Sequence, residues 1–458
     1  MCSISIRTLT NKRNLMILII KILVILVILV FLYFCQKSLV QAFAFYLAVK
    51  MVLPTTTRIG GISIYAFMLL CLLFFVLVKK GNKQCDFSRK NLKIALFPLL
   101  TLVVPLFFIG LFGEVDYAFQ YKQLFQFALT EIIPYCLFII IVTSEAKLQL
   151  CIKTLLISFI VIGIWGIITY FIKENPLVLS FALAFDYSKD MFIGDGTGSV
   201  RGAFTSTATG NQSEGPIPWG QICLILAGFG LFFKGMKDMH LRKVYIVLAI
   251  FNCFMSTKRS AILPLLVVVA YYLFKVGFFT KRNIIYFLGV LGFSAVVISS
   301  TPTLQKYYHA NIEPSIFFWD DNLAAKNEIK GSNREMRITQ AKYVNKLIEN
   351  NEIFGLGYGY TAKHIERYGG NTDALFFESL YLWAIANSGY LGLLVWIIFF
   401  YKWSRRMIAN RSEALDMYVF NGSYILSVFL TNIYCSFAYY MIASAFIIKY
   451  HQLKKYRI

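Results

Sequence analysis

The sequence predicts an all-α integral membrane protein, a polytopic bundle of about 12 transmembrane helices with two long external loops. Three observations support this class. Hydrophobic residues make up 58% of the 458 residues and charged residues only 15%, whereas soluble domains carry roughly 25% charged residues. Apolar runs recur along the whole chain. The basic residues gather in short links between these runs, which is typical of membrane proteins.

A transmembrane helix needs about 20 consecutive apolar residues to cross the hydrocarbon core. The candidate spans are residues 14–34, 60–78, 94–113, 124–143, 154–172, 216–233, 244–257, 260–274, 284–300, 379–401, 417–434 and 436–448. Because these runs cover most of the chain without a composition break, we predict a single transmembrane domain over residues 1–458.

The links between spans alternate between strongly basic and weakly charged, which sets the predicted orientation. Placing the basic links in the cytoplasm puts both termini there as well. Residues 37–54 are the ambiguous segment, because counting them as a span would reverse every later link. We therefore interpret 37–54 as a re-entrant or interfacial segment. The alternative is that the N-terminus lies outside and 37–54 crosses the membrane.

Two long loops fall on the predicted outer side, over residues 173–215 and 301–377. Long loops inside a compact protein are often functional. The second loop contains apolar residues at helical spacing, which predicts an amphipathic helix over residues 338–349. Its apolar face comprises Ile338, Ala341, Val344, Leu347 and Ile348, and its polar face Lys342, Lys346 and Glu349.

Composition and motifs also exclude several classes. The formal net charge is +22, but the basic residues lie in membrane links, so no nucleic-acid partner is expected. The cysteines avoid the long loops, which argues against a disulfide framework or a zinc site. The sequence contains no Walker A, HExxH or CxxC motif. We therefore expect no metal and no cofactor, and we expect the lipid bilayer as surroundings.

Basic residues on the outer side oppose the general charge bias, so they are the first candidate site residues. Arg201 lies in a loop rich in Gly, Ser and Thr, "GSVRGAFTSTATGNQ". Lys258 and Arg259 lie between two apolar runs in "STKRSAI". Arginine binds phosphate oxygens in pairs, which suits an anionic lipid headgroup. The plain alternatives are a solvated loop arginine and an interfacial anchor whose side chains reach the headgroups.

The long second loop adds further candidates in "SNREMRITQAKYVNKLIENNEIFGLGYG". Arg334 and Arg337 are three residues apart, so they share one face of a helix. Gly355 and Gly357 follow this helix in a glycine-rich turn where backbone and ligand can approach closely. A glycine-rich turn alone is weak evidence for a phosphate site, whereas the whole arrangement is more specific.

Titratable side chains near the next span are candidate general bases. Asp373 and Glu378 stand just before or at the start of that span, and His364 lies upstream in the loop. A carboxylate or an imidazole there could accept a proton from a sugar hydroxyl. A polar surface role is the alternative for His364. Glu131 lies inside a span, where it is either a proton site or a helix-packing partner.

The order of these motifs resembles the bacterial O-antigen polymerase and O-antigen ligase superfamily. The resemblance covers roughly residues 60–450 and is most specific over 334–394. It is carried by an external arginine loop, the "STKRS" turn, the long loop with "NNEIFGLGYG", and "ESLYLWAIANSGYLGLL" at the next span. Ligases usually carry a histidine in an "HN" context before that span. Here Asn371, Thr372 and Asp373 occupy the place, which argues against a ligase.

The resemblance implies a GT-C-like, metal-independent glycosyltransferase at the outer face of the bacterial inner membrane. The donor would be an oligosaccharide on undecaprenyl diphosphate, with Arg201 and Arg259 on the diphosphate. We expect a polymerase of repeat units for O-antigen of lipopolysaccharide, capsule or exopolysaccharide, and a chain-length regulator remains open as a partner. The alternatives are an O-antigen ligase or O-oligosaccharyltransferase, and, from another class, a transporter or flippase.

Overall fold

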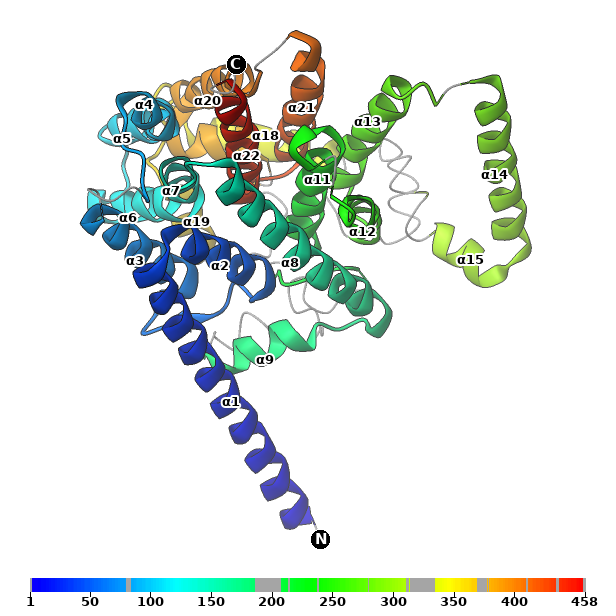
Figure 1. Cartoon of the computed structure of the whole chain (residues 1–458), viewed down its shortest axis with the longest axis horizontal. Coiled ribbons are helices and arrows are strands. Elements are labelled where there is room, and N and C mark those ends of the chain that lie inside the picture. Colours follow the sequence, from blue (N-terminus) through cyan, green and yellow to red (C-terminus); the bar gives the residue numbers. More distant parts are fainter. Residues whose placement is uncertain are drawn as a thin grey trace. The chain divides into compact units, whose positions relative to one another are not determined.

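The computed structural model describes the chain except for several short gaps. It covers residues 2–79, 84–185, 207–212, 215–236, 239–278, 280–309, 313, 334–368, 377, 379–408, 411–433 and 436–455. This part is almost entirely helical (Figure 1), which confirms the predicted all-α class. The exception among the described residues is a hairpin of strands β1 (Arg58–Ile59) and β2 (Ile62–Ser63). It turns at two glycines with positive φ.

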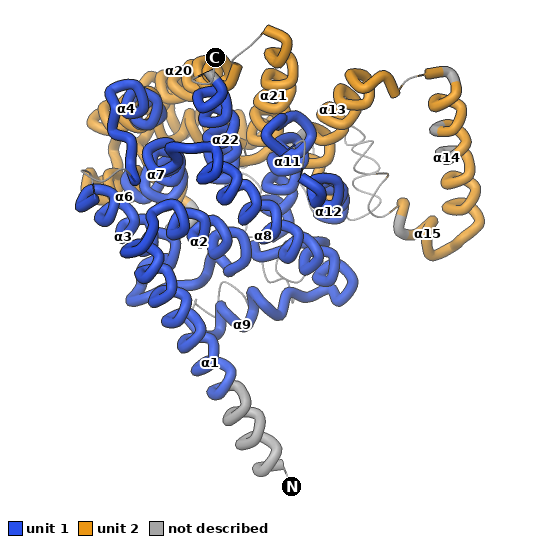
Figure 2. Tube along the Cα trace, in the orientation of Figure 1, with its two compact units in different colours: residues 1–100, 125–256, 434–458 blue, residues 101–124, 257–433 orange. Residues whose placement is uncertain are grey.

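The chain forms two compact units, coloured separately in Figure 2. Unit 1 comprises Met1–Leu100, Phe125–Ser256 and Tyr434–Ile458, and unit 2 comprises Thr101–Leu124 and Thr257–Ile433. Unit 1 contains α1 (Cys2–Lys37), α2 (Leu39–Val52), α3 (Ile64–Val78), α4 (Arg89–Ala95), η2 (Ala128–Ile132), α7 (Ile133–Ile141), α8 (Glu145–Ile172), α9 (Pro176–Ala184), α11 (Pro216–Phe232), η3 (Lys234–Met236), α12 (Arg242–Met255) and α22 (Phe437–Lys455).

Unit 2 is assembled from two separate stretches of sequence. It contains α5 (Val104–Gly110), α13 (Arg259–Lys275), α14 (Lys281–Ser300), α15 (Pro302–Tyr307), α18 (Arg334–Leu347), α19 (Tyr360–Tyr368), α20 (Leu380–Met407), η5 (Arg411–Glu413) and α21 (Ala414–Leu430). Two elements have residues in both units: η1 (Leu99–Val103) and α6 (Tyr117–Phe127).

Long apolar helices occur where several spans were predicted. Within the described residues, four helical stretches are long and apolar enough to cross a membrane: Asn14–Lys37, Tyr117–Ile141, Glu145–Ile172 and Leu380–Met407. The bent pair Arg89–Ala95 and Leu99–Gly110, with 47° between its helices, would be a fifth. Shorter apolar helices cover Leu39–Val52, Ile64–Val78 and Pro216–Phe232. The helical membrane class is therefore supported, while the number twelve stays a prediction.

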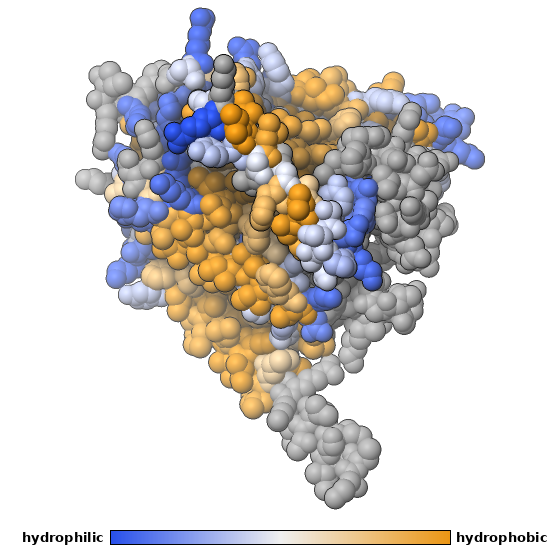
Figure 3. Space-filling view, turned by 90° about the vertical axis from the view of Figure 1, so that its right-hand side faces the viewer, coloured by the Kyte–Doolittle hydropathy of each residue, from blue (hydrophilic) through white to orange (hydrophobic). Residues whose placement is uncertain are grey.

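Apolar side chains are also exposed in the manner expected of lipid-facing helices. Leu18 of α1, Val161 of α8 and Val247 of α12 each expose more than half of their surface. Figure 3 shows apolar residues gathered over a large part of one face. Exposed apolar patches of this extent are unusual on soluble monomers, so this surface fits contact with lipid.

The first three helices show how residues 37–54 are arranged. Lys79, just after α3, donates from Nζ to the carbonyl oxygens of Cys35 (2.9 Å) and Gln36 at the end of α1. The backbone N–H of Leu39 donates to Gln84 Oε1 (3.1 Å). The C-terminal ends of α1 and α3 therefore lie together, at the end of unit 1 where α2 begins.

The other end of α2 lies where α3 begins, because Tyr65 Oη donates to the carbonyl oxygen of Leu53. Helices α2 and α3 are thus an antiparallel pair of 14 and 15 residues. At 1.5 Å per residue each is about 21–23 Å long. If α3 crosses the membrane, α2 crosses it too. Whether residues 37–54 span the membrane or form a re-entrant segment stays a prediction.

Helix α20 is broken at Gly389, whose φ of 64° and ψ of −169° lie outside the helical region. The backbone groups freed by the break are paired with the segment before α19. Tyr390 N–H donates to Glu352 O (2.8 Å) and Leu391 N–H to Ile353 O (3.1 Å). A Cβ at position 389 would lie 2.3 Å from Ile353 O. Only glycine therefore allows this segment to dock into the break.

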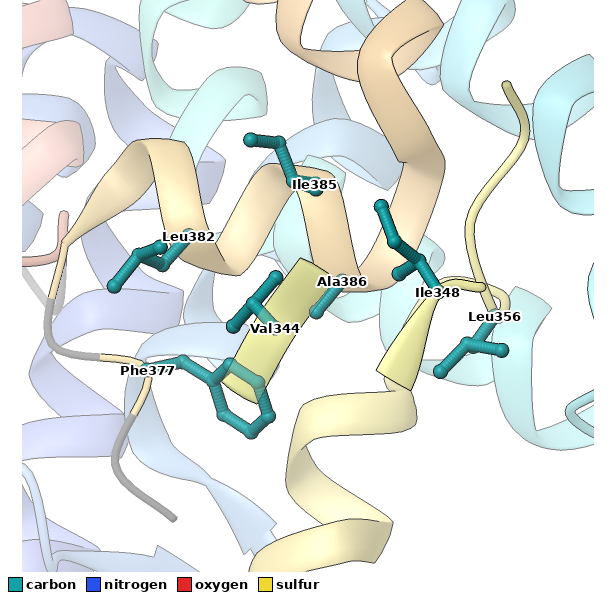
Figure 4. Packing of buried hydrophobic residues seen from close by; sticks show 7 residues of the cluster. All are labelled: Val344, Ile348, Leu356, Phe377, Leu382, Ile385 and Ala386. Atoms are coloured by element: carbon teal, nitrogen blue, oxygen red, sulfur yellow. The ribbon is translucent and has the colours of Figure 1, made fainter. Parts of the chain in front are cut away.

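An apolar cluster holds α18 and the docked segment against the first half of α20. Its members are Val344, Ile348, Leu356, Phe377, Leu382, Ile385 and Ala386 (Figure 4). The predicted amphipathic helix is therefore present, with Val344 and Ile348 buried and Lys342 and Lys346 exposed. Ile338 differs from the prediction, because 46% of its surface is exposed.

Candidate anion-binding site in unit 2

Three basic side chains from two segments of unit 2 come together at the start of α13. Lys258 is the extended residue that precedes the helix, and Arg259 is its first residue. Both are partly buried. Arg337 of α18 lies close enough to Arg259 to repel it electrostatically. The structure thus unites candidates that are 78 residues apart in the sequence numbering.

The pKa values of these groups reflect the crowding of positive charge. Burial lowers the pKa of Arg259, and the neighbouring Arg337 lowers it further. Burial likewise lowers the pKa of Lys258, with a contribution from Arg259 beside it. Arginine keeps its proton in proteins, so the two guanidinium groups stay charged at neutral pH. Like charges held together in a partly buried place create a positive potential that attracts an anion.

Helix α13 reinforces this preference for an anion. It has 17 residues, and its first-turn N–H groups carry the positive end of the helix dipole. The preceding residue Thr257 has a φ of 55°, which turns the chain sharply between α12 and α13. This turn places Lys258 and Arg259 at the helix start.

Arg337 is positioned by the packing of α18. It lies four and seven residues before Ala341 and Val344, so the three share one stripe of the helix. Val344 is 1% exposed in the cluster against α20. The same stripe that anchors α18 thus holds Arg337 next to Arg259. Arg334 is the first residue of α18, and only its backbone is described.

His364 is buried between two tyrosines and is not the surface residue that the sequence also allowed. It is 5% exposed. Its Nε2 lies 2.9 Å from Tyr343 Oη and its Nδ1 lies 3.2 Å from Tyr360 Oη. A neutral imidazole has one donor and one acceptor nitrogen, so one tyrosine donates a hydrogen bond and the other accepts one. Tyr343 of α18, His364 and Tyr360 of α19 form a continuous polar chain.

The glycine-rich turn "FGLGYG" has a structural task. Gly355 and Gly357 have φ values of 69° and 109°. Their N–H groups donate to Asn351 O (2.7 Å) and Asn387 O (3.0 Å). Amides used in this way are not available to an anion in this conformation. The prediction that these glycines bind phosphate stays a prediction, and the geometry assigns them to shaping the turn.

Buried amide side chains fix the turn, and the sequence analysis did not single them out. Asn387 Oδ1 accepts a hydrogen bond from Thr361 N–H (3.2 Å), and Gln120 Oε1 accepts one from Tyr358 N–H (3.0 Å). Asn387 and Gln120 are 0% and 1% exposed. The signal for Asn387 was present in "AIANSGY", where polar residues interrupt an apolar run.

Three predicted site residues, Arg201, Asp373 and Glu378, lie outside the described residues. Glu131 is described and is 9% exposed, in the π-helical turn η2 of unit 1. Its Oε2 accepts a hydrogen bond from the backbone N–H of Ala438 (2.7 Å) in the first turn of α22. This contact supports the role of a helix-packing partner. Within the described residues, no group of three His, Cys, Asp or Glu side chains could hold a metal ion.

Comparison with known families gives one match for this region. Residues 244–397 match the family model described as O-Antigen ligase. No curated protein matches the chain. The matched segment contains Lys258, Arg259 and Arg337, together with the glycine-rich turn and the break at Gly389.

Proposed function

Since the match over residues 244–397 supports membership of the O-antigen polymerase and ligase superfamily, we propose that this protein is a repeat-unit polymerase. It joins oligosaccharides carried on undecaprenyl diphosphate, at the outer face of the bacterial inner membrane. The observation that carries the proposal is the convergence of Lys258, Arg259 and Arg337 in unit 2. The diphosphate of the donor is the anion for this site.

In the proposed reaction, a hydroxyl of the acceptor repeat unit attacks the anomeric carbon of the donor glycan. The bond from this carbon to the acceptor oxygen forms while its bond to the diphosphate oxygen breaks. The acceptor hydroxyl gives its proton to a base, and undecaprenyl diphosphate leaves. Negative charge grows on the leaving diphosphate, so fixed cations at that place stabilise the transition state more than the ground state.

The cations of unit 2 suit this task because they are fixed before substrate arrives. Arg259 belongs to the first turn of α13, and Arg337 is held by the packing of α18 on α20. Bidentate guanidinium–phosphate pairs supply both charge and orientation. Arg334, on the same helix, and Arg201 are proposed as further diphosphate contacts.

The general base is proposed to be Asp373 or Glu378, with His364 as the third candidate. His364 already has hydrogen-bond partners at both ring nitrogens. To take a proton from substrate, His364 must break its hydrogen bond to one of the two tyrosines and bind the acceptor hydroxyl instead. Carboxylates need no such exchange, which favours the two acidic residues.

The orientation is proposed from the paired ends of α1 and α3. The link from Lys79 to Lys93 is rich in basic residues, so we place it in the cytoplasm. The C-terminal end of α1 contacts the start of this link. A single crossing by α1 then puts the N-terminus outside. This replaces the expectation of a cytoplasmic N-terminus, and the C-terminus stays on the cytoplasmic side.

An elongation assay tests the function directly. The purified protein is reconstituted in lipid nanodiscs with the host's own undecaprenyl-diphosphate-linked repeat unit, and products are resolved by gel electrophoresis. We expect a ladder of lipid-linked oligomers with the wild-type protein and none with Arg259→Ala. If the wild-type protein forms no ladder under any acceptor condition, the polymerase proposal is wrong.

An O-antigen ligase is the second candidate, because the matched family model carries that description. The same assay separates the two functions when lipid A core is added. A ligase transfers the glycan to the core and forms no ladder without it. In cells, repeat units that accumulate on the cytoplasmic side of the Arg259→Ala strain would instead indicate a flippase.

A further inference from the structure

The rotation of α18 about its own axis sets the direction of Arg337. A helix with its side chains has an outer radius of about 5–6 Å, so a rotation of about 20° would move a side-chain end by about 2 Å. A shift of that size would change the separation of Arg337 from Arg259, its neighbour at the anion site. Groups that act on a substrate need to be held more closely than this.

Apolar packing alone resists this rotation weakly. Val344 and Ile348 hold α18 against α20 within the apolar cluster. The hydrophobic effect has no direction, and a core that is repacked loses its unique arrangement before it loses stability. A directional hydrogen bond beside the apolar stripe fixes the rotation better.

Tyr343 makes such a hydrogen bond. It directly precedes Val344 in α18, so it points about 100° away from the apolar stripe. Its Oη lies 2.9 Å from Nε2 of His364 in α19. Tyr343 is half-buried and His364 is 5% exposed, and burial strengthens a hydrogen bond. The contact joins two helices at a place where rotation of α18 would break it.

His364 is itself held in place. Its Nδ1 lies 3.2 Å from Oη of Tyr360, which is one turn earlier in α19, and this contact orients the imidazole ring. The start of α19 is tied to α20, because the N–H of Thr361 donates to Oδ1 of Asn387 (3.2 Å). Helix α19 is therefore a support, anchored on α20, against which Tyr343 holds α18.

A further hydrogen bond between α18 and α20 contributes less to this restraint. Tyr390 Oη donates to Asn345 Oδ1 (3.3 Å). Both side chains are exposed, so water can replace either partner and the net gain is small. The buried contact of Tyr343 with His364 is the stronger restraint on rotation.

We propose that His364 is a positioning residue of the anion site. Through Tyr343 it fixes the rotation of α18, and with it the place of Arg337 beside Arg259. The proposal rests on the proposed function for the identity of the anion, the diphosphate. It gives His364 a task other than proton transfer, which leaves the general base among the two acidic candidates.

Binding is measured without turnover. The probe is undecaprenyl diphosphate without a glycan, titrated to the full-length protein in nanodiscs. Tyr343→Phe removes only the hydroxyl that contacts His364, so it is expected to fold. We expect this variant to raise the Kd by about 3- to 10-fold, the effect of one lost hydrogen bond.

The matched control is Tyr360→Phe. This variant also takes one hydroxyl from His364, but the lost contact lies within α19 and does not reach α18. The Kd should change by less than about twofold. A general loss of stability would affect both tyrosine variants alike, and Tm values of each variant show that it is folded.

Two substitutions of His364 itself separate positioning from proton transfer. The amide of glutamine extends about as far from Cα as Nε2 does, so His364→Gln can still bond to Tyr343. The shorter His364→Asn reaches only the place of Nδ1. Neither amide is a general base. We expect His364→Gln to keep the wild-type Kd and His364→Asn to weaken binding as Tyr343→Phe does.

Two outcomes would overturn the positioning role. One is an equal Kd for Tyr343→Phe and Tyr360→Phe, whether both are weakened or both are unchanged. The other is a wild-type Kd for both His364→Gln and His364→Asn with elongation lost in both, which would identify His364 as the general base. Failure of the proposed function looks different: the expected order of Kd values appears, while the wild-type protein forms no glycan ladder.

Discussion

The polar groups buried in unit 1 and those in unit 2 are of different kinds. Unit 2 gathers like charges, with Lys258, Arg259 and Arg337 repelling one another at the start of α13. Unit 1 contains buried ammonium groups, a buried carboxylate and several neutral atoms that have no hydrogen-bond partner among the described residues. Like charges attract an anion, whereas opposite charges and neutral polar groups that are buried together can compensate one another. The comparison therefore favours unit 2 as the place of the proposed anion site.

The largest effect is expected from Arg259→Ala. Loss of one preorganised cation on a developing charge slows the bond-forming step by about 10²–10³-fold. Initial rates in the nanodisc elongation assay measure this loss. The matched control is Arg282→Ala, because Arg282 is an exposed arginine of unit 2 that contacts the Tyr286 ring. Equal rates for both variants would show that Arg259 does not act at the proposed anion site, and unit 2 would then have no special role in binding the diphosphate.

Gly389→Ala should disrupt the frame that holds Arg337. The substitution forces a left-handed φ on alanine and brings Cβ to 2.3 Å from Ile353 O. Together these effects cost about 2–5 kcal/mol. Limited proteolysis and thermal unfolding in nanodiscs measure the loss. Gly422→Ala is the control, because a Cβ there meets nothing within 4 Å in helix α21, and it should leave the Tm unchanged or slightly higher.

Salt should weaken binding at the anion site of unit 2. Binding of undecaprenyl diphosphate to the partly exposed cations there should weaken several-fold between 50 and 500 mM NaCl, because screening acts on exposed charge. The affinity is measured with the full-length protein in nanodiscs. An affinity that does not change with salt would show that these cations do not bind the diphosphate.

The smallest effect is expected from pH. Burial lowers the pKa of Lys258, so this ammonium loses its proton at a lower pH than an exposed lysine does. Anion binding should therefore weaken as the pH rises from 7 to 10, through the loss of one positive charge. Lys258→Arg keeps its charge over this range and should flatten the profile. A profile that is already flat in the wild-type protein would exclude Lys258 from the anion site.

Sequence patterns predicted the helical class and the members of the cationic site, because hydropathy and charge placement are local properties. Helical spacing also predicted α18 with its buried Val344 and Ile348. The juxtaposition of Arg259 and Arg337 depends on how α18 packs, which no local pattern contains. The break at Gly389 was hidden because an isolated glycine is common in transmembrane helices.

Residues 37–54 illustrate a different limit. Their composition allowed either a span or a re-entrant segment, and the charge bias was used to decide. The contacts of Lys79 and Gln84 place the C-terminal ends of α1 and α3 together, which neither the composition nor the charge bias could show. Whether this one short helix crosses the membrane decides on which side the N-terminus lies. The charge bias is weak near the N-terminus, so it does not predict that side reliably.

The break in α20 would also limit how deep in the membrane the proposed reaction lies. The helix after Gly389, Tyr390–Met407, has 18 residues and is about 27 Å long. That length nearly covers the hydrocarbon core of a bilayer. The nine residues before the break are therefore spare for crossing the membrane. They are free to run at the level of the headgroups, which is where a polyprenyl carrier keeps its diphosphate and where a glycan first meets water.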